Sequence, residues 1–224
     1  AWSMNRYAPD EYLNRYCENF GAYADEIKYA IVDFYESFPE LNAKYLEKHL
    51  STYFNYTKTA PPEGITNFVL KEGSIIDYGK RMTDNFDKDL GKWLCLEYAE
   101  AIKPIIVNSD KICSRFEEIT EKLNEPLKTH FKIKWLLSAK TLNYIYKWYI
   151  ALHDAKFYRD KCDGENMKKS ILEASGYLFD YLEYRKCAEY GKFKNWYRGD
   201  LKMNIKQRLY DTLKIIGQTP EIFR

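Results

Sequence analysis

Aromatic and charged side chains are interleaved in two segments near the ends of the chain, and these residues are the best candidates for binding. The first segment spans residues 1–16 and the second spans residues 193–205. An aromatic ring stacks on the apolar face of a sugar, and neighbouring Arg and Asp side chains bind its hydroxyls. The alternative is that the same side chains anchor a loop between helices. The candidate ligand or partner contacts are Trp2, Tyr7, Trp196, Tyr197, Arg198 and Asp200.

Histidine is scarce, which restricts metal-dependent and acid–base chemistry. One of the three histidines, His153, precedes Asp154 and resembles the metal-binding dyad of HD phosphohydrolases. A second, His130, is expected on the same helix, where 23 residues at 1.5 Å each separate the two by about 35 Å. That distance is too long for a shared ion. We therefore interpret His153 as the edge of a core stripe, and a helical metal-dependent hydrolase using His153 and Asp154 remains an alternative.

Other catalytic signatures are missing from the sequence. It contains no phosphate-binding loop, dinucleotide fingerprint or nucleophile elbow. The acidic groups near residues 84–89 and 117–121 are interrupted by other residues and are typical of solvated helix faces. The sequence therefore predicts no catalytic residue, no metal site and no cofactor within this chain.

Composition excludes two further classes of function. The chain has 224 residues and a formal charge of +2, from 35 basic and 33 acidic side chains, which argues against a nucleic-acid-binding protein. It has no apolar run near the roughly 20 residues of a membrane span. The 21 Tyr, 12 Phe and 5 Trp are enough to form a folded core. The five cysteines form no C-x-x-C pair, so we expect buried free thiols on helices.

Hydrophobic periodicity predicts helices from end to end. Apolar residues recur every three or four positions in most segments, and few segments alternate with period two. We expect an all-α, up-and-down bundle of about seven helices with negligible strand. Gly21 and Asp163-Gly164 are expected to end helices, and Pro104 is expected to kink or restart a helix spanning 93–123. The segment 131–153 is apolar nearly all round, which is typical of a central helix.

The loop richest in proline predicts the domain organisation. Residues 57–64 contain Pro61-Pro62 and form the clearest loop in the chain. We predict an N-terminal helical subdomain at 1–58, a loop at 59–70 and a main helical bundle at 71–224. One continuous domain is the alternative.

The opening residues resemble the segment that follows the (β/α)8 barrel in several glycoside hydrolases. The stretch from Ala1 to Tyr12, followed by Phe20-Gly21 and residues 24–27, is similar to the turn and helix that leave the barrel in family-115 α-glucuronidases. Family-84 and related hexosaminidase-type enzymes share this arrangement. Residues 196–200 and 202–204 resemble segments near the end of such helical domains. Ser3-Met4 stands where the family pattern has Asn-Pro, which is a departure at the main motif.

This resemblance implies a non-catalytic accessory helical domain of a carbohydrate-active enzyme. Such a domain would support or line the catalytic domain or mediate oligomerisation, with the catalytic acids in a barrel upstream of Ala1. The implied partners are that upstream domain or another protein, with carbohydrate contact and oligomer formation left open. A periplasmic or extracellular location would follow, and abundant Lys, Asn, Ile and Tyr are typical of A·T-rich bacterial coding sequences. The alternative is a stand-alone helical protein-interaction module.

Overall fold

The chain forms an all-α, multi-helix fold, as the hydrophobic periodicity predicts. The computed structural model describes residues 9–37, 75–88, 92–189 and 204–220, and these residues contain no strand. A π-helical turn, η6, joins two of the helices without a break. The elements are α1 (Pro9–Glu18), η2 (Gly21–Tyr23), α2 (Ala24–Ser37), α6 (Ile75–Asp84), α7 (Lys92–Lys122), α8 (Leu127–Phe131), η6 (Lys132–Leu136), α9 (Leu137–Asp160), α10 (Gly164–Tyr184), η7 (Arg185–Ala188) and α11 (Ile205–Lys214).

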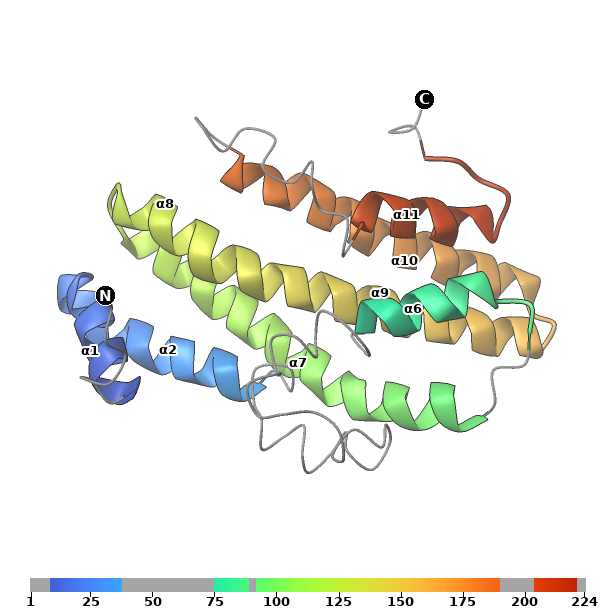
Figure 1. The fold of residues 1–224 in the computed structure, drawn as a ribbon, viewed down its shortest axis with the longest axis horizontal. Coiled ribbons are helices and arrows are strands. Elements are labelled where there is room, and N and C mark those ends of the chain that lie inside the picture. Colours follow the sequence, from blue (N-terminus) through green and yellow to red (C-terminus); the bar gives the residue numbers. More distant parts are fainter. Residues whose placement is uncertain (1–8, 38–74, 89–91, 190–203, 221–224) are drawn as a thin grey trace, which may run out of the picture.

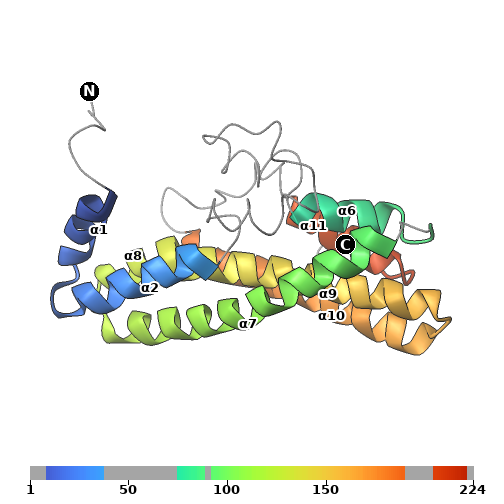
Figure 2. The same cartoon turned by 90° about the horizontal axis from the view of Figure 1, so that it is seen from below.

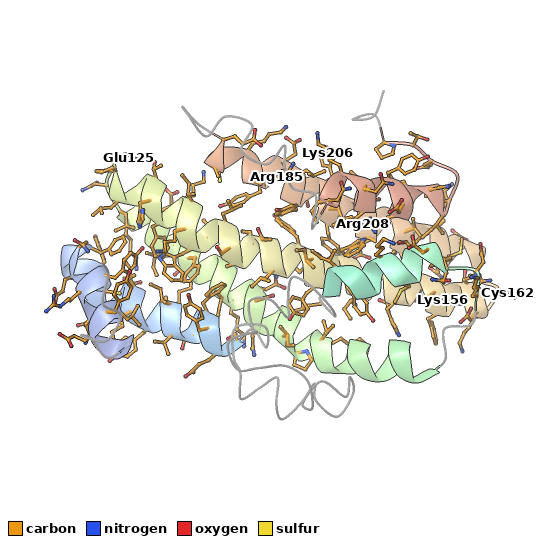
Figure 3. The ribbon with its side chains drawn as sticks, viewed as in Figure 1. Glu125, Lys156, Cys162, Arg185, Lys206 and Arg208 are labelled. Carbon is orange, nitrogen blue, oxygen red and sulfur yellow. The ribbon has the colours of Figure 1, made fainter. Side chains whose placement is uncertain are left out.

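Helix α9 is the centre of the fold. It packs against α7, α10 and α6, while α2 lies along α7 and α11 lies on α10 (Figure 1). Together α8, η6 and α9 form one continuous rod, called here the α8–α9 rod. Figure 3 places Glu125 and Cys162 just beyond its two opposite ends. Helix α1 stands at the Glu125 end of the rod, and α6 and α11 lie toward the Cys162 end (Figure 2).

The central position of α9 follows from its composition. Its largest buried side chains, Trp148, Tyr146, Tyr149 and Leu152, point to several sides of the helix, because their spacing covers more than half a turn. Burying such a ring contributes about 2–3 kcal/mol relative to exposure. A helix with apolar residues on most of its circumference is stable only when neighbours cover it, as predicted for 131–153.

The predicted helix stops at Gly21 and Asp163 are confirmed. Gly21 has a φ of +58°, a left-handed conformation that costs glycine little and ends the run that began at Pro9. Asp163 is the N-cap of α10, where its carboxylate accepts a hydrogen bond of 3.1 Å from the backbone N–H of Asn166. These two residues set where the chain turns at opposite ends of the bundle.

Pro104 does not restart a helix, contrary to one of the two predicted outcomes. It lies inside α7, which continues unbroken from Lys92 to Lys122. Proline removes one backbone hydrogen bond and favours a bend, and Figures 1 and 2 show α7 bending along its length. The buried side chains of Ile102 and Ile105 flank the proline and hold both parts of α7 against the core.

Helix α6 approaches α9 closely at a glycine. Gly79 faces the indole of Trp148, and a Cβ atom at this position would lie 2.3 Å from the ring. The indole Nε1 donates a hydrogen bond of 3.1 Å to the hydroxyl of Thr212 in α11. Trp148 is fully buried, so it packs beneath α6 and is oriented by α11. This one side chain therefore connects three helices.

Several sequence predictions fall on other parts of the chain. The predicted helix at 39–53, His49 and the loop at 59–70 lie outside the described residues, so the division into 1–58 and 71–224 stays a prediction. Side chains of α2 and α7 belong to one continuous hydrophobic cluster. None of the described helices combines the length and apolar character needed to cross a bilayer.

Candidate functional site

The six predicted contact residues are outside the part of the chain that the structure describes. Trp2 and Tyr7 precede α1, and Trp196, Tyr197, Arg198 and Asp200 fall between η7 and α11. Their role in binding stays a prediction.

The His153–Asp154 pair has no third ligand in the described part of the chain. The Nδ1 atom of His153 is buried and 3.5 Å from Asp154 Oδ1, yet the two form no hydrogen bond, because this distance is at the limit and the geometry is poor. The carboxylate of Asp154 is half-exposed. Among the residues described, no group of three His, Cys, Asp or Glu side chains could hold a metal ion.

A hydrogen-bonded aromatic cluster joins α1 to the α8–α9 rod. Its members are Tyr16, His130, Lys134 and Trp135, and we call it the Tyr16 cluster. The indole Nε1 of Trp135 donates to the hydroxyl of Tyr16 over 2.7 Å, and that hydroxyl lies 3.0 Å from His130 Nε2. Because an indole N–H only donates, the Tyr16 oxygen is the acceptor and its own proton is directed to His130.

The electrostatics of the Tyr16 cluster keep both titratable groups neutral near pH 7. Burial lowers the pKa of His130, and the nearby Lys134 ammonium lowers it further. Burial raises the pKa of Tyr16. Neutral His130 Nε2 accepts the phenol proton, so the cluster is a fixed hydrogen-bond chain. A phenol with a raised pKa is a poor nucleophile, and the arrangement is suited to positioning and binding rather than to covalent catalysis.

Cationic and aromatic groups also meet at the surface of this end. The ammonium of Lys134 lies 5.1 Å from the ring centroid of Tyr16 and 5.6 Å from that of Trp135. The ring of Tyr35, from α2, packs edge-on against Trp135 at 6.0 Å. Tyr35 remains 45% exposed, and Tyr12 and Tyr29 are 67% and 64% exposed. The first two helices therefore present three solvent-facing tyrosines.

A surface pocket of about 310 Å³ lies between the end of α2 and the middle of α7. Its floor is apolar and its rim carries both acidic and basic groups. Asp33 on the rim pairs with Arg115 of α7, which fixes the carboxylate. Such a pocket is suited to a short polar segment of a partner rather than to a deeply buried ligand. Its lining residues are Asp33, Glu36, Ser37, Pro104, Ile105, Asn108, Lys111 and Ile112.

The sequence predictions missed the Tyr16 cluster. Tyr16 and Trp135 are 119 residues apart, so no local spacing connects them. The only signal is that both lie on apolar stripes beside a polar group, which many core residues share. Long-range packing, rather than a motif, brings them together.

The thiols are more varied than predicted. Cys17 and Cys113 are buried and free, and burial raises the pKa of Cys113 to about 12. Cys162 is exposed in the α9–α10 turn, so the expectation of a buried thiol is wrong there. It lies in a left-handed turn residue with a φ of +58°, which faces solvent rather than the core.

Known proteins supply no name for this arrangement. Models of protein families, curated proteins and solved structures were compared with the chain, and none of them matches it. The interpretation of its function therefore depends on the residues themselves.

The Tyr16 cluster predicts a pH dependence of stability. Because folding lowers the pKa of His130, the unfolded state takes up a proton first as pH falls through about 6.5, and stability decreases. Solvent screening keeps the loss below about 1 kcal/mol. Urea unfolding of wild type and His130→Gln near pH 7.5 and near pH 5.5 measures it. A smaller loss in the variant is expected, and equal losses in both proteins would contradict the assignment.

Proposed function

We propose that this chain is a non-catalytic helical domain of a carbohydrate-active enzyme, and that it docks on its partner domain through the outer sides of α1 and α2. The observation that carries this proposal is the exposure of Tyr12, Tyr29 and Tyr35 on these two helices. Tyrosine is enriched at protein interfaces because it combines a large apolar ring with a hydroxyl that hydrogen-bonds.

The position of these tyrosines supports the proposal. They lie on the first two described helices, directly after the segment that resembles the exit from a catalytic barrel. The inner side of α2 is already used, because Ile27, Ile31 and Phe34 are buried in the core. The outer sides are therefore the ones left for a neighbouring domain.

The Tyr16 cluster supports a docking role as well. Its hydrogen bonds tie α1 to the α8–α9 rod over more than one hundred residues of sequence. A docking surface gains affinity when its elements are held rigid before binding, since less conformational entropy is then lost. No observation on the described residues favours the helical metal-dependent hydrolase at His153 and Asp154.

The coding sequence upstream of Ala1 tests the proposal first. We expect an in-frame (β/α)8 barrel there. Hydrogen exchange is then compared between the longer chain and residues 1–224 alone, with slower exchange expected in α1 and α2 of the longer chain. A start codon directly upstream would overturn the proposal and leave a stand-alone helical interaction module. Unchanged exchange in α1 and α2 would overturn the docking surface.

Substitution of the exposed tyrosines gives the quantitative prediction. In the longer chain, Tyr12→Ser with Tyr29→Ser is expected to speed exchange of α1 and α2 amides about tenfold, the equivalent of about 1.4 kcal/mol at an interface. Phe157→Ser is the control, because this exposed ring lies at the opposite end of the α8–α9 rod. A similar effect of the control on α1 and α2 would contradict a specific interface.

A further inference from the structure

The outer side of α10 carries an exposed apolar stripe. Leu172 is 43% exposed and Phe179 is 46% exposed. They are seven residues apart, so they lie on one side of the helix, two turns from each other. The core-facing residues of α10 are different ones, including Ile171, Ala174 and Leu178. The packing of a single chain therefore gives no reason for Leu172 and Phe179 to be apolar.

A glycine lies at the centre of this stripe. Gly176 is in the interior of α10, where glycine costs about 1 kcal/mol relative to alanine. A Cβ atom here would meet no other atom within 4 Å, and φ is not positive. Neither a turn nor a close neighbour within the chain requires this glycine. Close approach of another helix is the common reason for a small residue on an exposed helix surface.

The charges on the same side are arranged symmetrically about Ser175 and Gly176. Leu172 and Phe179 lie three residues outside this pair, one on each side. Lys168 and Glu183 lie seven residues outside it, and Glu165 and Lys186 lie ten residues outside it. Offsets of three, seven and ten residues stay on one side of an α-helix. Each symmetric pair is either apolar with apolar or basic with acidic.

We propose that two copies of this chain associate through α10, with the two helices antiparallel and a two-fold axis between Ser175 and Gly176. In this arrangement Leu172 packs on Phe179 of the second copy, and Gly176 lies at the crossing. Lys168 faces Glu183 of the second copy, and each contact occurs twice because the interface is isologous. This proposal is independent of the docking of α1 and α2.

Charge selects the second copy and the antiparallel orientation. A parallel pair would place Lys168 against Lys168 and Glu183 against Glu183, which is unfavourable. The antiparallel pair makes four complementary contacts from residues 165, 168, 183 and 186 of both copies. Within one chain Lys186 already pairs with Glu183 at 2.6 Å, and both side chains are solvent-exposed. In the dimer Glu183 lies between this lysine and Lys168 of the second copy.

The size of the interface predicts a reversible dimer. One helix crossing buries less than the roughly 800 Å² per partner of a stable complex. We therefore expect a concentration-dependent equilibrium between monomer and dimer rather than a permanent dimer, and a weaker one at high salt.

Sedimentation velocity with charge-swap variants tests the proposal. Lys168→Glu and Glu183→Lys are each expected to weaken association about tenfold, because each creates two like-charge contacts. The double variant carrying both changes is expected to restore it. Lys206→Glu, an exposed change of the same charge on α11, is the control and is expected to have no effect. Phe179→Ser is expected to abolish the dimer.

Circular dichroism verifies that each variant is folded. A wild-type chain that stays monomeric at every concentration overturns the proposal. A dimer that Lys168→Glu does not weaken, or that the double variant does not restore, places the interface elsewhere and overturns it as well. These outcomes leave the docking of α1 and α2 untouched, because that surface is read by exchange in other helices.

Discussion

Gly79→Ala is expected to destabilise the fold by about 1–3 kcal/mol, although alanine favours helix over glycine by about 1 kcal/mol. The added Cβ would lie 2.3 and 2.5 Å from two atoms of the Trp148 indole. That ring is rigid and fully buried, so it cannot rotate away, and α6 must move off α9 instead. Urea unfolding monitored by tryptophan fluorescence measures the loss.

Two comparisons isolate the cause of this loss. Gly176→Ala is the matched control, because it adds the same methyl group in open space, and it is expected to stabilise the monomer by about 1 kcal/mol. In a Trp148→Phe background the cost of Gly79→Ala should be smaller, since the shorter ring leaves room for the methyl group. Equal costs in both backgrounds would show that the contact with Trp148 is not the reason.

Phe116→Ala is expected to cost about 3–5 kcal/mol, the largest effect of a single substitution that we predict. Phe116 is fully buried, and its ring lies 5.4 Å from Phe131 and 5.7 Å from Phe34. It therefore joins α7 to both α2 and the α8–α9 rod. Truncation leaves a cavity that three helices surround, and they cannot all close it. Calorimetry and urea unfolding measure the loss.

Phe157→Ala is the control for Phe116→Ala, because this ring is exposed and is expected to cost no more than about 0.5 kcal/mol. The shape of the unfolding curve also tests the predicted division of the chain. If Phe116→Ala splits unfolding into two steps, with α2 released first, an N-terminal subdomain is supported. A single step in both proteins supports one continuous domain. Equal losses for Phe116→Ala and Phe157→Ala would contradict the assigned core.

Local features of the fold were predictable because they depend on neighbouring residues. The stripe of Ile27, Ala30, Ile31 and Phe34 is buried as its spacing predicts. The same is true of the cap at Asp163, where a short carboxylate meets free backbone N–H groups. Pro104 was harder to predict, since the lost hydrogen bond competes with tertiary packing that the local sequence does not display.

The candidate sites were less predictable for a different reason. Tyr16, His130 and Trp135 meet only after α1 has packed on the α8–α9 rod, and no spacing in the sequence encodes that meeting. The stripe on α10 is visible as a symmetric pattern. Its exposure is not, because periodicity alone does not tell which side of a helix the rest of the chain covers.

The π-helical turn η6 makes the length of the α8–α9 rod unusually exacting. A π turn holds about one residue more than an α turn, and each residue turns a helix by about 100°. Loss of one residue from 132–136 would restore an ordinary helix and rotate its two halves against each other. Either Phe131 or Trp148 would then point away from its neighbours. In related chains, insertions and deletions should accumulate at loops and avoid this turn.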